Sequence, residues 1–189
     1  MADILTLDDA RKALRLAVAD TSNDTDLTET YIPAVTPIVE DVVGPVMSRT
    51  GLTFTTDGGV VSIDLPTAFT AITSVTESGS ALTEGTDFVA DPKSGLVHRG
   101  SAAGRFLFAA GVRNVTVTYT VGYAAAAANV LANHRLAARI ILRQMWQADQ
   151  QGARPGLGST DTETTPSGFL IPRRAAELLR STPNLPGFA

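Results

Sequence analysis

The chain has 189 residues, of which 44% are hydrophobic and 18% are charged, and its net charge is −4. This length allows one domain with a hydrophobic core, or one domain that carries an insertion. The absence of cysteine excludes disulfides and thiolate metal sites, and two histidines disfavour a histidine-rich metal site. No apolar run approaches the roughly 20 residues that span a bilayer, so we expect no membrane partner.

The charge is distributed unevenly along the chain. Residues 1–47 hold nine acids and three bases, whereas residues 124–189 hold four acids and seven bases. Opposite charge at the two ends could attract copies of the chain to one another, and ordinary solvated faces are the alternative. The first nine residues are acidic where a signal peptide would be basic, so we expect synthesis in the cytoplasm.

The first element predicted is a helix that starts after Thr6. The Thr6 hydroxyl can accept the backbone N–H of Asp8 or Asp9, and both aspartates suit the positive end of a helix. Apolar residues recur at helical spacing across residues 7–18.

A second helix is predicted through residues 27–47, capped by Thr25 or Asp26. Prolines lie inside this pattern. Proline lacks the N–H donor and clashes with the preceding turn, so we expect a kink at Pro37 or at the Gly44-Pro45 pair.

From Arg49 the pattern changes to alternation and turn signals. Asp57-Gly58-Gly59 predicts a hairpin turn between a strand at residues 52–56 and a return strand at residues 60–65. Turn chemistry also marks Ser78-Gly79 and residues 91–95. Further strands are predicted at residues 72–76, 81–82, 87–89, 96–98, 106–108 and 112–121, which gives one antiparallel sheet of about five to seven strands.

The longest helix is predicted at residues 125–150, with almost no loop before it and one broad apolar face. Residues 152–168 lack apolar periodicity and are predicted to be a loop. A last short helix runs from Pro172 to about residue 181, and the tail after it is expected to be extended. The sequence thus predicts an α+β chain.

The candidate chemistry is sparse. His98 has no identifiable nucleophile or carboxylate partner, and His134 lacks the second ligand of a zinc helix. The glycine-rich residues 152–158 match no phosphate-binding motif, and the aspartates of residues 20–26 lack calcium-loop spacing. We therefore predict no catalytic residue, no cofactor and no metal.

Arginines four residues apart form a stripe on the longest helix. Arg135, Arg139 and Arg143 could contact phosphates, or could pair with Asp8 and Asp9 of a neighbouring copy, and a solvated helix face is the alternative. We take these five residues as candidate subunit-interface residues.

The order of these elements resembles that of the head–tail connector (adaptor) proteins of long-tailed bacteriophages. The residues that carry the resemblance are Asp26-Leu27-Thr28, Ile38-Val39-Glu40, Ile72-Thr73-Ser74-Val75, residues 87–97, residues 115–123, Phe169-Leu170-Ile171-Pro172 and Glu177-Leu178-Leu179. It implies a mainly helical connector fold of about four helices. Residues 1–48 and 124–189 would form one helical domain, and residues 49–123 would be a small antiparallel β module inserted between the second helix and the long helix.

The resemblance also implies a structural role without enzymatic activity. Such proteins form a ring of about twelve copies beneath the portal, in the virion neck, with head-to-tail contacts between copies. Viral double-stranded DNA passes through the lumen without sequence-specific contact, and the next neck or tail-completion protein binds the other side. Flexible or terminal segments bind the portal, which makes candidates of Arg154, Phe169, Arg173, Arg174, Leu185 and Phe188.

Two other functions stay open from the residues alone. The chain could be another neck or tail-completion protein, which would lack the portal contact. It could also be a nucleic-acid-binding module that uses the arginine stripe, although a pI near 5.1 disfavours it. An enzyme would need a carboxylate paired with His98.

Overall fold

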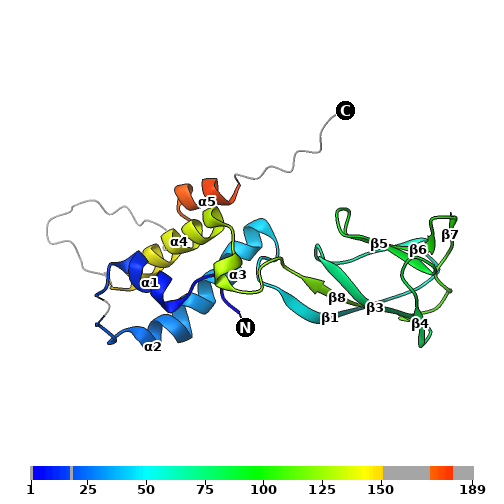
Figure 1. Cartoon of the computed structure of the whole chain (residues 1–189), viewed down its shortest axis with the longest axis horizontal. Coiled ribbons are helices and arrows are strands. Elements are labelled where there is room, and N and C mark those ends of the chain that lie inside the picture. The colour runs from blue at the N-terminus through cyan, green and yellow to red at the C-terminus, as the bar shows by residue number, and fades with distance from the viewer. Residues whose placement is uncertain (1, 18, 151–170, 181–189) are drawn as a thin grey trace, which may run out of the picture. The chain divides into compact units, whose positions relative to one another are not determined.

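The computed structural model describes residues 2–17, 19–150 and 171–180. The chain divides into two compact units: a helical unit, from residues 3–43 and from residue 129 onward, and a β unit, residues 44–128. Helices and antiparallel strands are both present, so the predicted α+β class is confirmed (Figure 1).

Helix α1 (Leu7–Leu14) begins with the predicted cap. The backbone N–H of Asp9 donates to Thr6 Oγ1 at 3.1 Å, and the Thr6 N–H donates back to the Asp9 carboxylate at 3.3 Å. This reciprocal capping box satisfies two N–H groups that the helix itself leaves unbonded. The helix is shorter than the predicted pattern because Arg15 turns into the left-handed region, with φ 60°, and ends it.

The second helical segment begins and ends earlier than predicted. It consists of α2 (Asp24–Asp26), a π-helical turn (Leu27–Tyr31) and α3 (Ile32–Val43), and no side chain caps its start. The predicted caps at Thr25 and Asp26 are therefore wrong. Gly44, with φ 82°, and the following proline end the helix at Val43 because glycine takes the left-handed conformation without strain.

Helix α4 (Ala132–Gln150) is the centre of the helical unit and packs against α1, α3 and α5 (Arg173–Leu179). It begins seven residues later than position 125, after a 3₁₀ turn at Ala127–Asn129. The alanine run favours a helix, but Ala124 is bonded to Val46 and Ser48 of the β unit. These non-local bonds override local propensity. The buried face of this region is formed by Val130, His134, Ala137, Ala138, Ile141 and Leu142.

An aromatic pair joins the π-helical turn to the C-terminal half of α4. The rings of Tyr31 and Trp146 lie 5.1 Å apart between centroids, tilted by 60°. The Tyr31 hydroxyl donates to the Asp149 carboxylate at 2.7 Å. This hydrogen bond and burial raise the pKa of Tyr31 to about 12. The pair thus fixes the irregular turn against the central helix.

The β unit contains two antiparallel sheets. The first has the order β1 (Arg49–Thr56), β8 (Val115–Val121), β3 (Ala71–Glu77) and β4 (Ser80–Leu82). The second has the order β2 (Ser62–Asp64), β6 (Leu96–Ser101) and β5 (Phe88–Asp91), with β7 (Gly104–Arg105) also paired to β6. Alternate residues of β8 are buried, and they join residues of both sheets in one hydrophobic core.

The predicted hairpin at residues 52–65 and the single sheet are wrong. Leu52 lies opposite Tyr119 of β8, whereas Ile63 lies opposite Val97 of β6, so the two segments belong to different sheets. The Gly58 N–H donates to Gly111 O at 3.0 Å, so the residues between the two strands are bonded to a segment far along the chain. The predicted turn at Asp57-Gly58-Gly59 is also wrong, because the chain only bends there, and local turn residues do not say which strands pair.

Other turn predictions are confirmed. Ser78 and Gly79 both have positive φ, 50° and 83°, which suits the two-residue turn between β3 and β4. Asp91 accepts hydrogen bonds from the Lys93 N–H and the Ser94 hydroxyl, as an aspartate does at the start of a turn.

Candidate functional site

Two of the candidate interface residues meet within one chain. Arg139 of α4 forms an ion pair with Asp9 of α1, and both side chains are largely covered. Burial alone would raise the pKa of Asp9, but the hydrogen bonds from Arg139 and Thr6 outweigh it and lower that pKa below its ordinary value. The pair therefore fastens α1 to the central helix, and a role for it between copies stays a prediction.

The other candidate interface residues do not join this pair. Arg143 is exposed and Arg135 is half-buried, and neither forms an ion pair within the described residues. Asp8 pairs with Lys12 one turn along α1, at 2.6 Å, on the exposed side of the helix. An exposed ion pair of this kind adds little stability and is easily replaced by another contact. Asp8 and Arg143 are therefore both accessible to a partner.

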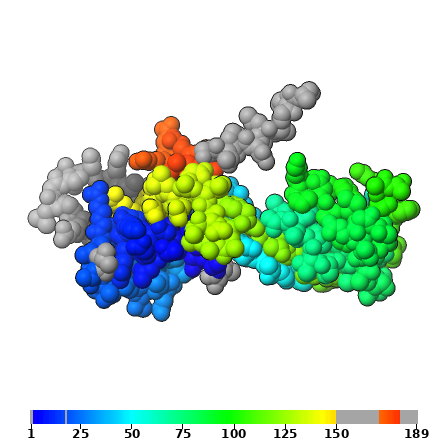
Figure 2. Space-filling view, viewed as in Figure 1, coloured from blue at the N-terminus to red at the C-terminus, as the bar shows by residue number. Residues whose placement is uncertain are grey.

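Helix α5 carries the candidate portal-binding residues that the structure describes. Figure 2 shows this helix, in orange, at the surface of the helical unit over α4. Arg173 pairs with Glu177 at 3.2 Å, which offsets the unfavourable placing of a cation at a helix start, and Arg174 is exposed. Arg154, Phe169, Leu185 and Phe188 lie outside the described residues, as do the predicted loop and tail.

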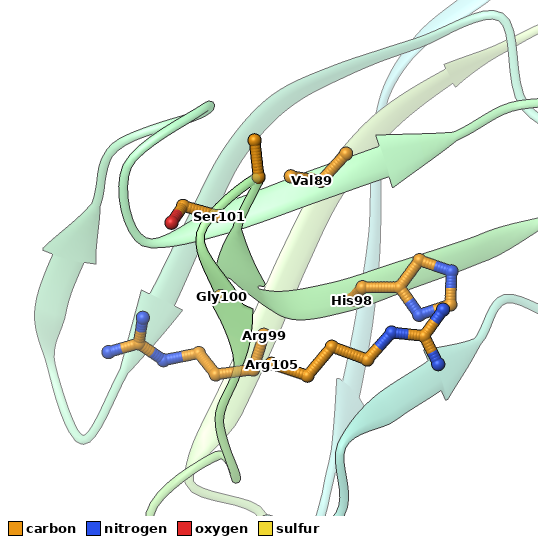
Figure 3. Close-up of a pocket in the computed structure, with 7 residues that line it drawn as sticks. Val89, His98, Arg99, Gly100, Ser101 and Arg105 are labelled. Carbon is orange, nitrogen blue, oxygen red and sulfur yellow. The ribbon is translucent and has the colours of Figure 1, made fainter.

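A pocket of about 250 Å³ lies in the β unit beside β6 (Figure 3). Val89 lies opposite His98, and Arg105 lies opposite Gly100, so the register places all four on one face of the second sheet. His98 Nδ1 is buried and has no hydrogen-bond partner among the described residues.

Arg99 also lines the pocket, but its guanidinium is engaged with acidic residues of the β unit. Its guanidinium lies 3.5 Å from the Glu77 carboxylate and 3.7 Å from that of Asp87, and it also donates to the Asp87 carbonyl oxygen. These acids are therefore engaged, and within residues 44–128 no carboxylate is hydrogen-bonded to His98. Ser101 accepts from the Ala103 N–H instead of contacting His98. Within the described β unit, His98 and Ser101 are thus not hydrogen-bonded as the base and nucleophile of acyl transfer would be.

The described residues form neither a metal-binding group nor a membrane-spanning helix. In the described part of the chain, no three histidine or acidic side chains are grouped so as to hold a metal ion. None of the helices in those same residues has the length and apolar character needed to cross a bilayer.

A surface loop carries the largest apolar exposure in the β unit. Phe106, Leu107 and Val112 expose 60%, 62% and 83% of their surface. The predicted strand at residues 106–108 is wrong, since only Phe108 turns inward and the segment is irregular. The sequence held a signal that was missed: three consecutive large apolar residues cannot all face one core from a strand, because alternate side chains point to opposite faces.

The fold of the chain is similar to that of neck chains of gene transfer agent (GTA) particles. It matches a chain in the neck of the empty particle, treated with sixfold symmetry, with TM-score 0.61 and 19% identity over 97% of this chain and 93% of that one. It matches a chain in the neck of the native particle, treated with twelvefold symmetry, with TM-score 0.57 and 16% identity over 99% and 98%.

A third similarity is to a chain in the virion of the native GTA particle, with TM-score 0.54 and 18% identity over 97% of this chain and 93% of that chain. No protein-family model matches the chain, and no curated protein sequence matches it. The likeness extends over both units, so the arrangement of helices and strands belongs to the same fold as these neck chains.

Proposed function

We propose that this chain is a structural subunit of the neck of a phage-like particle, where copies form a closed ring between head and tail. One observation carries the proposal: nearly the whole chain shares its fold with neck chains in particles treated with sixfold and twelvefold symmetry. A closed cyclic ring requires each copy to present two different surfaces to its neighbours. No catalytic machinery is needed for this role.

The finer role we propose is that of a head–tail connector (adaptor). The ring would lie under the portal, with about twelve copies, and DNA would pass through its lumen. Arg173 and Arg174 on α5 would contact the portal, together with the segments that contain Arg154, Phe169, Leu185 and Phe188. An exposed cationic pair on a short surface helix suits an acidic partner surface.

Removal of the chain from the particle tests this role. If the gene is deleted, we expect heads and tails to accumulate separately, because the part that joins them is missing. Complementation with the intact chain should restore joined particles, and negative-stain electron microscopy counts both forms. Normal numbers of joined particles in the deletion strain would reject a neck role.

The portal contact has its own test. We expect the Arg173→Glu, Arg174→Glu double variant to lose capture by the purified portal, with at least a tenfold drop in bound protein. The matched control is Lys93→Glu, which reverses one exposed cation of the β unit that has no role in either proposed contact. Equal capture of the double variant and the intact chain would exclude α5 from the portal contact.

A further inference from the structure

The loop of residues 106–113 is held rigidly, although three of its side chains face solvent. Its inner anchor is Phe108, which is 1% exposed. Hydrogen bonds fix the backbone on both sides of that anchor: the Phe108 N–H donates to Val60 O at 2.9 Å, and the Ala109 N–H donates to the Glu77 carboxylate at 2.7 Å.

The far end of the loop is fixed in the same way. The Arg113 N–H donates to the Asp57 carboxylate at 2.6 Å, and the Asn114 amide donates to Ala109 O at 2.7 Å. Gly58 lies so close that a Cβ there would be 1.8 Å from Ala109 O. Because the native fold already orders this loop, a partner would bind it without the usual cost in conformational entropy.

The outer surface of the loop has the composition of a protein interface. Phe106, Leu107 and Val112 form its apolar part, and Val60 of the adjacent segment is 43% exposed. Arg105 and Arg113 are exposed at the two ends of the loop and form no ion pair within the described β unit. Apolar side chains with arginines at the margin are typical of protein–protein contacts, and an exposed apolar patch of this kind marks an interaction site.

A second copy of the chain fits this surface by charge. The helical unit exposes acidic residues along its second segment, namely Asp26 and Glu29 near its start and Asp41 near its end, where Val42 is 40% exposed. Exposed acids along this segment complement the guanidinium groups of Arg105 and Arg113, and Val42 offers an apolar contact beside Asp41. In a cyclic ring, each copy presents the loop to one neighbour and the acidic segment to the other neighbour.

We propose that the 106–113 loop is a ring contact: in each copy it packs against the acidic helical surface of residues 24–43 of the next copy. This inference rests on the proposed ring, and it adds which surfaces meet. It gives the β unit a task in assembly that is separate from the portal contact proposed for α5.

Photocrosslinking tests the contact in assembled particles. The photoreactive residue p-benzoyl-phenylalanine replaces Leu107 in the full chain, and particles are irradiated and separated by denaturing electrophoresis. We expect a product of twice the mass of the chain, with peptides from residues 24–43 joined to position 107. A product that joins position 107 only to a different particle protein would overturn the proposal.

Matched variants provide a second readout. We expect Leu107→Asp to reduce incorporation of the chain into particles at least tenfold, while its circular dichroism and melting temperature stay as in the intact chain. Thr86→Asp adds the same charge at another exposed position of the β unit and should incorporate normally. Normal incorporation of Leu107→Asp would also overturn the proposal. If even the intact chain is absent from particles, the neck role itself fails.

Discussion

At the residue scale, Asp9 has more than one structural task. Its backbone N–H and carboxylate complete the capping box of α1, and the same carboxylate receives the Arg139 guanidinium from α4. A single carboxylate thus fixes both the start of one helix and its packing on the next. Spacing identified the cap, but the sequence did not reveal the pair of Arg139 with Asp9, and contact of Arg139 with another copy stays a prediction.

Replacement of Arg139 should destabilise the helical unit. In Arg139→Met, the largely buried Asp9 carboxylate keeps its cap bonds but loses its cationic partner, and we expect a loss of about 1–3 kcal/mol in the free energy of unfolding. Arg143→Met, on the exposed side of the same helix, should cost less than about 0.5 kcal/mol. Urea unfolding monitored by circular dichroism measures both. Equal losses would show that the ion pair adds nothing.

The same carboxylate predicts a dependence on pH. Folding lowers the pKa of Asp9 from its ordinary value of 3.8, so the folded state holds its proton less tightly than the unfolded state does. The stabilisation is therefore complete above 3.8 and is lost as the pH falls through the lowered folded-state pKa. We expect the stability of Asp9→Asn to change less across this acidic range than that of the intact chain. Parallel curves from unfolding at a series of pH values would contradict this assignment.

At the element scale, the predictions that held rest on local chemistry. The Thr6 cap and the Ser78-Gly79 turn depend on residues within three positions of each other, and the sequence contains that information. The hairpin at residues 52–65 failed because β1 and β2 pair with strands far along the chain. The start of α4 failed for a similar reason, since Ala124 is bonded to the β unit. Pairing between distant segments is decided by the core as a whole.

Two glycines with the same φ angle allow the strain of a left-handed backbone to be distinguished from the steric overlap of an added Cβ. Gly51 and Gly122 both have φ 74°, but a Cβ at Gly51 meets open space, whereas one at Gly122 would lie 2.1 Å from Met47 O. Gly51→Ala should cost about 1–2 kcal/mol for the left-handed backbone. Gly122→Ala should cost about 1–3 kcal/mol more because backbone atoms must move apart. Thermal unfolding of the β unit measures the difference, and equal costs would contradict the close approach.

At the scale of the whole molecule, the sequence and the structure identify different surfaces. The sequence predicted that charged residues make the contacts with partners. In the structure, Arg173 and Arg174 lie on an accessible helix, whereas Arg139 forms an internal ion pair with Asp9. The 106–113 loop was missed because its residues read as a strand, and exposure depends on which of them the core accepts. His98 Nδ1 has no hydrogen-bond partner among the described residues, and burial lowers the pKa of His134.

Cryo-electron microscopy of the particle neck tests the central claim most directly. Particles that contain this chain are imaged, and the junction of head and tail is reconstructed without imposed symmetry. We expect a closed ring of this fold around a central channel, with the 106–113 loop of each copy seated on the next. Density for the neck that excludes this fold, or the chain located elsewhere in the particle, would contradict the account.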